Sequence, residues 1–266
     1  MHPILIKIGP VAIPSYGVFF ATGVLLAILL ALHLARQAGL DRNRLSDLIF
    51  YTLLVALLGA KIFLFLTEFH FYTSNPDQIK YLLTSGGTFY GGLIFGLFFA
   101  VWFIRKRKLD TWTVADILAP GIALAHGFGR IGCFMAGCCY GRPAGDCAIA
   151  VTFPDREHTV APAGQPLYPT QLMESALNFI NFMILLIVYK KKKFKGQVIS
   201  LYLINYSIIR FSVEFFRGDS DRGYIFGGMD RPFFSLSVPQ LISILGFTAG
   251  IILYQVFKRK FSAGEN

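Results

Sequence analysis

The stretch GFGRIGCF, residues 127–134, places Arg130 inside an apolar, glycine-rich run with the character of a membrane-spanning helix. A charged side chain at membrane depth is costly, and it usually holds an anion, a counter-ion or a lipid headgroup. The glycines leave space beside Arg130 for backbone or lipid. The stretch therefore predicts a membrane protein with a functional site near Arg130. In the alternative, the glycines only pack helices and Arg130 extends to the membrane surface.

The composition of the whole chain supports a membrane protein. Apolar residues make up 55% of the 266 residues and aromatic residues 15%, and the mean hydropathy is +0.57. A soluble domain of this length would expose much of that apolar surface to water. The sequence predicts an all-α, polytopic integral membrane protein with a single transmembrane domain, residues 1–266. Seven apolar stretches approach the roughly 20 residues that a span needs: 16–36, 48–69, 89–104, 114–136, 170–189, 197–216 and 236–257.

The basic residues predict the orientation of these spans. Four short tracts rich in lysine and arginine follow the first, third, fifth and seventh spans, at residues 36–44, 105–108, 190–195 and 258–260. Cytoplasmic loops carry an excess of such residues, so we expect the N-terminus outside and the C-terminus in the cytoplasm. The net charge of +10 is then explained by orientation and contact with anionic membrane lipids, and no nucleic acid partner is expected.

The segments outside the spans predict where function lies. Residues 1–14 lack a signal-peptide pattern, so we expect the first span to remain as an anchor. The longer and chemically varied loops fall on the predicted outer side, whereas the inner loops are short and basic. Binding residues concentrate on such loops, which predicts an outward-facing site. The outer loops lie near 71–88, 137–169 and 218–235.

A second polar cluster lies on a later span. Tyr206, Arg210, Glu214 and Arg217 follow one another at intervals of four, four and three residues, which places them on one helical face. Arg210 and Glu214 are spaced to form an ion pair, and Arg217 would then remain spare near the outer boundary. Two intramembrane arginine sites in one small chain predict a phospholipid phosphate as ligand.

Several motifs recur together in the order of a known family. They are SYG at residues 15–17, GAK at 59–61, YGGL at 90–93, GRIG at 129–132, YPTQLME at 168–174, the face formed by residues 206–217, and SVPQ at 237–240. With these motifs the chain resembles the prolipoprotein diacylglyceryl transferases along its whole length. Each motif alone is weak, whereas the ordered set combined with seven spans is specific.

The resemblance implies an activity and a set of site residues. Such enzymes of the bacterial inner membrane transfer the diacylglyceryl group of phosphatidylglycerol to the lipobox cysteine in a prolipoprotein signal peptide and release glycerol phosphate. By resemblance, Arg130 and Arg210 would hold the phosphate, Glu214 would orient Arg210, and Arg217 would gate the site or bind the headgroup. No metal or organic cofactor is implied. The resemblance adds substrate contacts from Tyr16, Lys61, Gly91, Gly92, Gly129, Gln171, Glu174, Tyr206 and Gln240.

The chain departs from the family pattern at the expected base. Many members have a histidine before Gly-Gly-Leu, where this chain has Tyr90. An ordinary tyrosine, with a pKa of about 10, is a poor base at neutral pH. We hypothesise that His126, four residues before Arg130 on the same helical face, serves as the base instead. A purely structural role between helices is the alternative for His126. Lys61 also replaces a more usual arginine, which keeps the charge and loses the bidentate geometry.

Four cysteines mark a further departure. Cys133, Cys138, Cys139 and Cys147 lie within fifteen residues on the predicted outer side, where an oxidising compartment permits disulfides. Either Cys138 or Cys139 paired with Cys147 would staple the loop. The spacing matches no recognised zinc pattern. A membrane thiol oxidoreductase is a further alternative, although redox pairs usually have two residues between their cysteines.

Two other classes of protein compete with the transferase. A transporter would also have intramembrane arginines and glycine-interrupted helices, but the inverted repeats typical of transporters are absent from the sequence. A non-catalytic relative that binds lipid or prolipoprotein is the stronger competitor, because Tyr90 replaces the usual base. Both arginine clusters are intact, which favours the enzyme.

Overall fold

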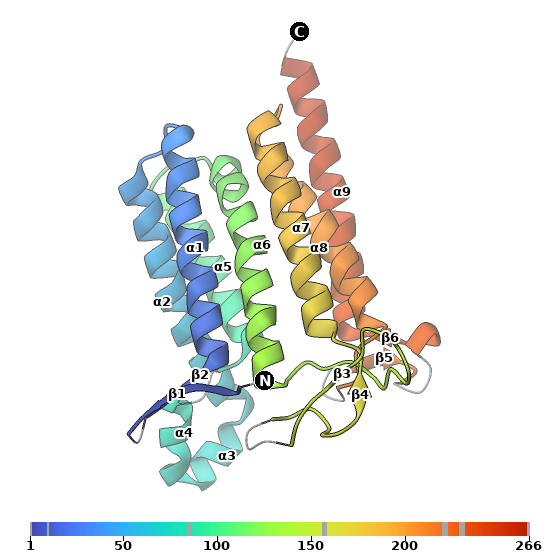
Figure 1. Cartoon of the computed structure of the whole chain (residues 1–266). Coiled ribbons are helices and arrows are strands. Elements are labelled where there is room, and N and C mark those ends of the chain that lie inside the picture. Colours follow the sequence, from blue (N-terminus) through green and yellow to red (C-terminus); the bar gives the residue numbers. More distant parts are fainter. Residues whose placement is uncertain are drawn as a thin grey trace. The chain divides into compact units, whose positions relative to one another are not determined.

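The computed structural model describes residues 2–9, 11–84, 87–155, 159–219, 223–228 and 232–264. Helices occur at all seven predicted spans (Figure 1): α1 Ser15–Gln37, α2 Arg42–Thr67, α5 Phe89–Lys106, α6 Thr111–Ala136, α7 Thr170–Lys191, α8 Gln197–Glu214 and α9 Val238–Gly264. Six of them, all except α8, are long and apolar enough to cross a membrane among the residues described. The exception α8 is the helix that carries Arg210 and Glu214. The protein is therefore mostly helical and polytopic, as the sequence predicted.

The segments between the long helices contain short elements. The region after α2 holds α3 Phe69–Ser74, a 3-10 turn at Pro76–Gln78 and α4 Ile79–Thr84. Three antiparallel pairs of strands join β1 Ile4–Ile8 with β2 Val11–Pro14, β3 Val151–Thr152 with β4 Pro166–Leu167, and β5 Tyr224–Phe226 with β6 Leu236–Ser237. A second 3-10 turn spans Pro232–Phe234. The strand pairs were not predicted from the sequence.

The chain forms two compact units, Met1–Ala31 with Ala115–Asn266, and Leu32–Val114. In the first unit, α8 packs between α7 and α9, which Figure 1 shows in gold to red. Small residues let helices approach closely, because membrane helices associate mainly through packing. A Cβ atom at Gly23 of α1 would lie 2.7 Å from Phe128 of α6. The α1–α6 contact therefore depends on glycine.

A buried carboxylate joins α6 to the start of α8. Asp116 is 0% exposed, and its oxygens accept hydrogen bonds from the backbone N–H groups of Gly196, Val198 and Ile199, each at 3.0 Å. The Lys192 ammonium lies 3.2 Å from the same carboxylate. The first N–H groups of a helix have no partner within the helix and attract negative charge. Asp116 therefore caps α8 from a different helix.

In the second unit, α2 and α5 pack against each other through glycines. A side chain at Gly91 would overlap with Phe63, and a Cβ atom at Gly92 would lie 3.2 Å from the Ala56 carbonyl oxygen. The backbone N–H of Thr88 donates to the Ala60 carbonyl at 3.1 Å at the start of α5. The glycines of the YGGL motif thus have a role in helix packing.

Candidate functional site

The first arginine site is an ion pair between two helices. Arg130 lies in the last two turns of α6 and Glu174 in the second turn of α7. Arg130 Nη2 is 3.0 Å from Glu174 Oε1, with side chains 20% and 2% exposed. A carboxylate this deeply buried needs a charged or hydrogen-bonding partner. Both residues were predicted from the sequence as site residues, but their pairing was not.

Tyr206 links this pair to the second arginine. It lies on α8 and interacts electrostatically with Arg130, Glu174 and Arg210. Three helices, α6, α7 and α8, therefore contribute to one polar cluster. The structure brings Tyr206, Arg130 and Arg210 together, although the first and second sequence motifs are about 75 residues apart.

The second arginine site contains the ion pair anticipated from the spacing. Arg210 Nη2 is 2.9 Å from Glu214 Oε2, with side chains 14% and 2% exposed. Ser237 Oγ donates to Glu214 Oε1 at 2.8 Å, and Gln240 Oε1 accepts from the Ser237 backbone N–H at 3.0 Å. Glu214 thus connects Arg210 to the start of α9. Gln240, expected as a substrate contact, stabilises this connection.

One nitrogen of the Arg210 guanidinium is buried. Its Nη1 atom has no hydrogen-bond partner among the residues that the structure describes. Buried donors are almost always paired in folded proteins, and each exception needs an explanation. A guanidinium fork with an unmatched donor suits an anion with several oxygens.

The prediction that Arg217 remains spare is wrong. Arg217 follows the end of α8, and its Nε donates to Asp219 Oδ1 at 2.7 Å while its Nη2 bonds Oδ2. Burial opposes the charge of Arg217, but the hydrogen bonds to Asp219, together with the charges of Cys139 and Asp219, outweigh it and raise the Arg217 pKa. The helix ends at Glu214, so the helical spacing that placed Arg217 on the Arg210 face no longer applies there.

His126 contacts the tyrosines beside the arginines. It lies one turn before Arg130 on α6, and its Nδ1 is 3.3 Å from the Tyr202 hydroxyl. The ring centroids of His126 and Tyr206 are 4.9 Å apart. His126 therefore contacts Tyr206, which interacts with Arg130, and this position suits either a base or a residue that positions Tyr206.

The glycines of the GRIG motif differ in their surroundings. A Cβ atom at Gly132 would lie 3.2 Å from Tyr16, and at Gly129 it would meet only Phe20, at 4.0 Å. Gly132 therefore packs α6 against α1, whereas the space at Gly129 is open. Tyr16 itself interacts electrostatically with Arg130.

Four predicted site residues belong to the second unit. Tyr90 of α5 is 47% exposed and packs edge-on against Phe89 at 5.8 Å. Lys61 is partly buried on α2, and the packing of Gly91 and Gly92 is described above. The proposed substrate contacts of all four residues stay predictions.

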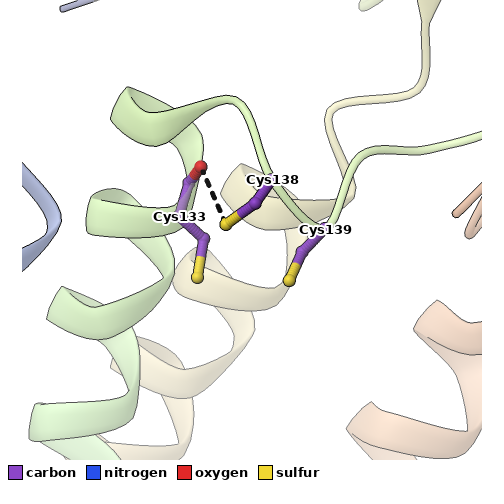
Figure 2. Close-up of side chains that lie close together, drawn as sticks. All are labelled: Cys133, Cys138 and Cys139. Carbon is purple, nitrogen blue, oxygen red and sulfur yellow. Dashed lines mark hydrogen bonds between the residues drawn. The ribbon is translucent and has the colours of Figure 1, made fainter. Parts of the chain in front are cut away.

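Three of the four cysteines lie close together. The sulfur atoms of Cys133, Cys138 and Cys139 all lie within 4.8 Å of one another, and the side chains of Cys138 and Cys139 extend toward the helix that carries Cys133 (Figure 2). All four cysteines are free thiols, so neither of the two possible staples to Cys147 is formed. Hydrogen bonding to Cys133 raises the pKa of Cys138. Hydrogen bonds from Cys133 and Cys138, helped by the Arg217 charge, lower the pKa of Cys139.

An apolar pocket of about 260 Å³ lies between α8 and α9. It has no charged lining residue, so it suits hydrocarbon rather than a headgroup. The lining residues are Ser207, Ile208, Phe211, Ser212, Ser243, Ile244 and Phe247.

Comparison with known proteins supports one family. A family model described as prolipoprotein diacylglyceryl transferase matches residues 3–256. Phosphatidylglycerol–prolipoprotein diacylglyceryl transferase 2 of Clostridium perfringens is 38% identical over 260 residues, covering 98% of this chain and 97% of that protein. The corresponding transferase of Clostridium tetani is 32% identical over 96% of this chain and 98% of its own length. That of Aeromonas salmonicida is 33% identical over 97% and 91%. The chain belongs to the prolipoprotein diacylglyceryl transferase family.

Proposed function

We propose that this protein transfers the diacylglyceryl group of phosphatidylglycerol to a cysteine thiol of a prolipoprotein. The observation that carries the proposal is the polar cluster in which Tyr206 interacts with both Arg130 and Arg210. Two guanidinium groups on neighbouring helices suit a phosphodiester at membrane depth. Membership of the family and the full-length similarity to named transferases support the same reaction.

In the proposed reaction, negative charge develops on the leaving phosphate, which we place beside Arg130 and Arg210. The thiolate sulfur attacks the terminal glycerol carbon of the diacylglyceryl group, a carbon–sulfur bond forms, and the carbon–oxygen bond to phosphate breaks. Glycerol phosphate leaves with the electron pair of that bond and takes up the proton that the thiol lost. Positive groups fixed beside the leaving phosphate stabilise its added negative charge. Arg130 and Arg210 are in our proposal the residues that do so.

The remaining site residues have supporting roles in the proposal. Glu214 holds Arg210, as their 2.9 Å ion pair supports, and Arg217 acts through its bond to Asp219 on the segment after α8. The open space at Gly129 admits the headgroup. Further expected contacts to lipid or signal peptide come from Tyr16, Lys61, Tyr90, Gly91, Gly92, Gln171, Glu174, Tyr206 and Gln240.

We further propose that the protein is a multi-pass protein of the bacterial inner membrane with its site facing the outer leaflet. The basic tracts after alternate helices support a cytoplasmic C-terminus. A lipobox cysteine would then reach the site after its signal peptide has crossed the membrane. Cysteine labelling from either side of sealed vesicles tests this orientation, and labelling of a C-terminal tag only from the outer side would contradict it.

Reconstituted protein tests the reaction directly. In liposomes that contain phosphatidylglycerol, a lipobox peptide should gain the mass of a diacylglyceryl group while an equal amount of glycerol phosphate is released. The same peptide with serine in place of cysteine should gain nothing, as should liposomes of phosphatidylethanolamine alone. Arginine-dependent binding of phosphatidylglycerol without any mass gain would instead identify a non-catalytic lipid-binding relative, the alternative that Tyr90 raises.

His126 is the proposed acceptor of the thiol proton. We expect His126→Ala to lower turnover by about a hundredfold or more, as is typical when a general base is lost. His126→Gln, which keeps a hydrogen-bonding group beside Tyr202, should remain equally low. The measurement is the initial rate of peptide modification across a range of pH. Unchanged turnover in His126→Ala would exclude the base, and recovery in His126→Gln would make His126 a positioning residue.

A further inference from the structure

The three clustered cysteines have the dimensions of a metal site. Zinc binds thiolate sulfur at about 2.3 Å, so two ligands of a tetrahedral site are about 3.8 Å apart. The sulfur atoms of Cys133, Cys138 and Cys139 all lie within 4.8 Å of one another. Shifts of about 1 Å or less, within the range of side-chain rotation, would bring all three to zinc-binding distance.

The backbone adopts an unusual conformation that brings the sulfurs together. Adjacent residues in an extended chain point to opposite sides, yet the side chains of Cys138 and Cys139 both extend toward the helix that carries Cys133 (Figure 2). Helix α6 ends at Ala136, and Cys139 has a φ of 59°, which is costly for a residue with a Cβ atom. Strained conformations of this kind concentrate at functional sites.

The loop that carries two of these cysteines is held in place by α7. Gln171 Nε2 donates to the Cys138 carbonyl at 2.8 Å, and Thr170 Oγ1 donates to the Cys139 carbonyl at 2.9 Å. The Cys138 backbone N–H also bonds the Cys133 carbonyl at 3.1 Å. Ligands fixed by a surrounding hydrogen-bond framework are characteristic of metal sites. Gln171, expected as a substrate contact, is thus committed to this loop.

Two positively charged side chains lie beside the cluster. Arg130 interacts electrostatically with Cys133 and Cys139, and Arg217 interacts with Cys139. Three thiolates around one divalent ion carry a net charge of −1, and the two guanidinium groups are complementary to such an anionic centre. Soft thiolate ligands select zinc over magnesium or calcium.

We propose that Cys133, Cys138 and Cys139 bind one zinc ion through three thiolates and leave its fourth coordination position open. Catalytic zinc sites have this form, with three protein ligands and one exchangeable ligand, whereas structural sites are closed by four. Cys147 is not a member of the cluster. Arg130, which interacts electrostatically with Cys133 and Cys139, also belongs to the proposed phosphate site.

The ligand that suits the open position is a thiol, and this part of the inference rests on the proposed function. A thiol that coordinates zinc loses its proton. The S–H bond of the lipobox cysteine would break as its S–Zn bond forms, with the proton accepted by the proposed base. The bound sulfur would then attack the glycerol carbon, and glycerol phosphate would leave and finally carry the proton. Zinc would thus assist the thiol activation for which Tyr90 is poorly suited.

Metal analysis of the purified full-length protein tests the site without any assay of activity. Protein kept reduced in detergent should contain about one zinc ion per chain, and cobalt replacing it should give the sulfur-to-metal absorption of a tetrahedral thiolate site. Cys133→Ser, Cys138→Ser and Cys139→Ser should each lower the zinc content at least tenfold. Cys147→Ser is the matched control and should keep full zinc. Elution as the same detergent-bound species shows that a variant is folded.

The contrary outcomes are equally specific. The metal site would be overturned if wild-type protein with Cys133, Cys138 and Cys139 all reduced bound neither zinc nor cobalt. It would also be overturned if protein isolated without reductant formed a disulfide within the cluster and kept that disulfide after zinc was added. Transferase activity that survives complete zinc removal would overturn the thiol-binding role. Zinc bound by a protein without transferase activity would instead contradict the proposed function and leave the metal site standing.

Discussion

Replacing Arg130 with Ala is expected to lower the rate of diacylglyceryl transfer by about a hundredfold to a thousandfold, the usual cost of removing one fixed group that stabilises developing charge. The change removes a guanidinium from the proposed phosphate site. It also leaves Glu174, which is 2% exposed, without the partner that lies 3.0 Å away. Initial rates in phosphatidylglycerol liposomes measure the effect. Arg130→Lys should recover only part of the rate, because lysine keeps the charge and loses the fork.

A double variant separates catalysis from stability. In Arg130→Ala combined with Glu174→Gln, a neutral amide replaces the buried carboxylate, so no unpaired charge remains. The thermal stability lost in the single variant should therefore partly return. The transfer rate should stay low, because the phosphate still lacks its guanidinium. Recovery of the rate together with the stability would show that Arg130 has only a structural role.

The second large effect is expected from Arg210. Arg210→Ala should lower the rate by about a hundredfold or more, because it removes the side chain whose buried Nη1 has no partner among the described residues. Glu214→Gln should have a smaller effect, since the Ser237 hydroxyl can still hold the remaining amide. The measurement is kcat and KM for phosphatidylglycerol in the same liposomes.

Arg36→Ala provides the matched control for the loss of an arginine. Arg36 lies exposed in the last turn of α1 and belongs to the predicted cytoplasmic tract. Its loss should leave both kinetic constants within about twofold, as expected of an exposed surface charge. An equal loss of rate in Arg36→Ala and Arg210→Ala would contradict a specific role for Arg210.

The long helices were predictable because their apolar stretches match the thickness of a bilayer. The stretch 170–189, for example, corresponds to α7 Thr170–Lys191. The hairpin of β1 and β2 was not predicted, since its strands have only five and four residues and follow no long-range pattern. Short strands leave little periodicity to detect.

The ion pairs of the site were predictable only where one helix contains both partners. Arg210 and Glu214 are four residues apart on α8, and their pairing follows from helical geometry. Arg130 and Glu174 lie on different helices, and nothing in their spacing indicates the contact. The cysteine cluster depends in the same way on a backbone angle, the positive φ of Cys139, that residue type does not reveal.

The Asp116 carboxylate is a common reference point from which the positions of Arg130 and Arg210 along their helices can be measured. Arg130 lies fourteen positions after Asp116 on α6, and Arg210 lies twelve positions after Val198 on α8. With a rise of about 1.5 Å per residue, the arginines stand about 21 Å and about 18 Å along their helices from the same carboxylate. One inserted residue in either interval would shift its arginine by about 1.5 Å and turn it by about 100°. The two helix lengths therefore hold Arg130 and Arg210 at similar distances from the same carboxylate.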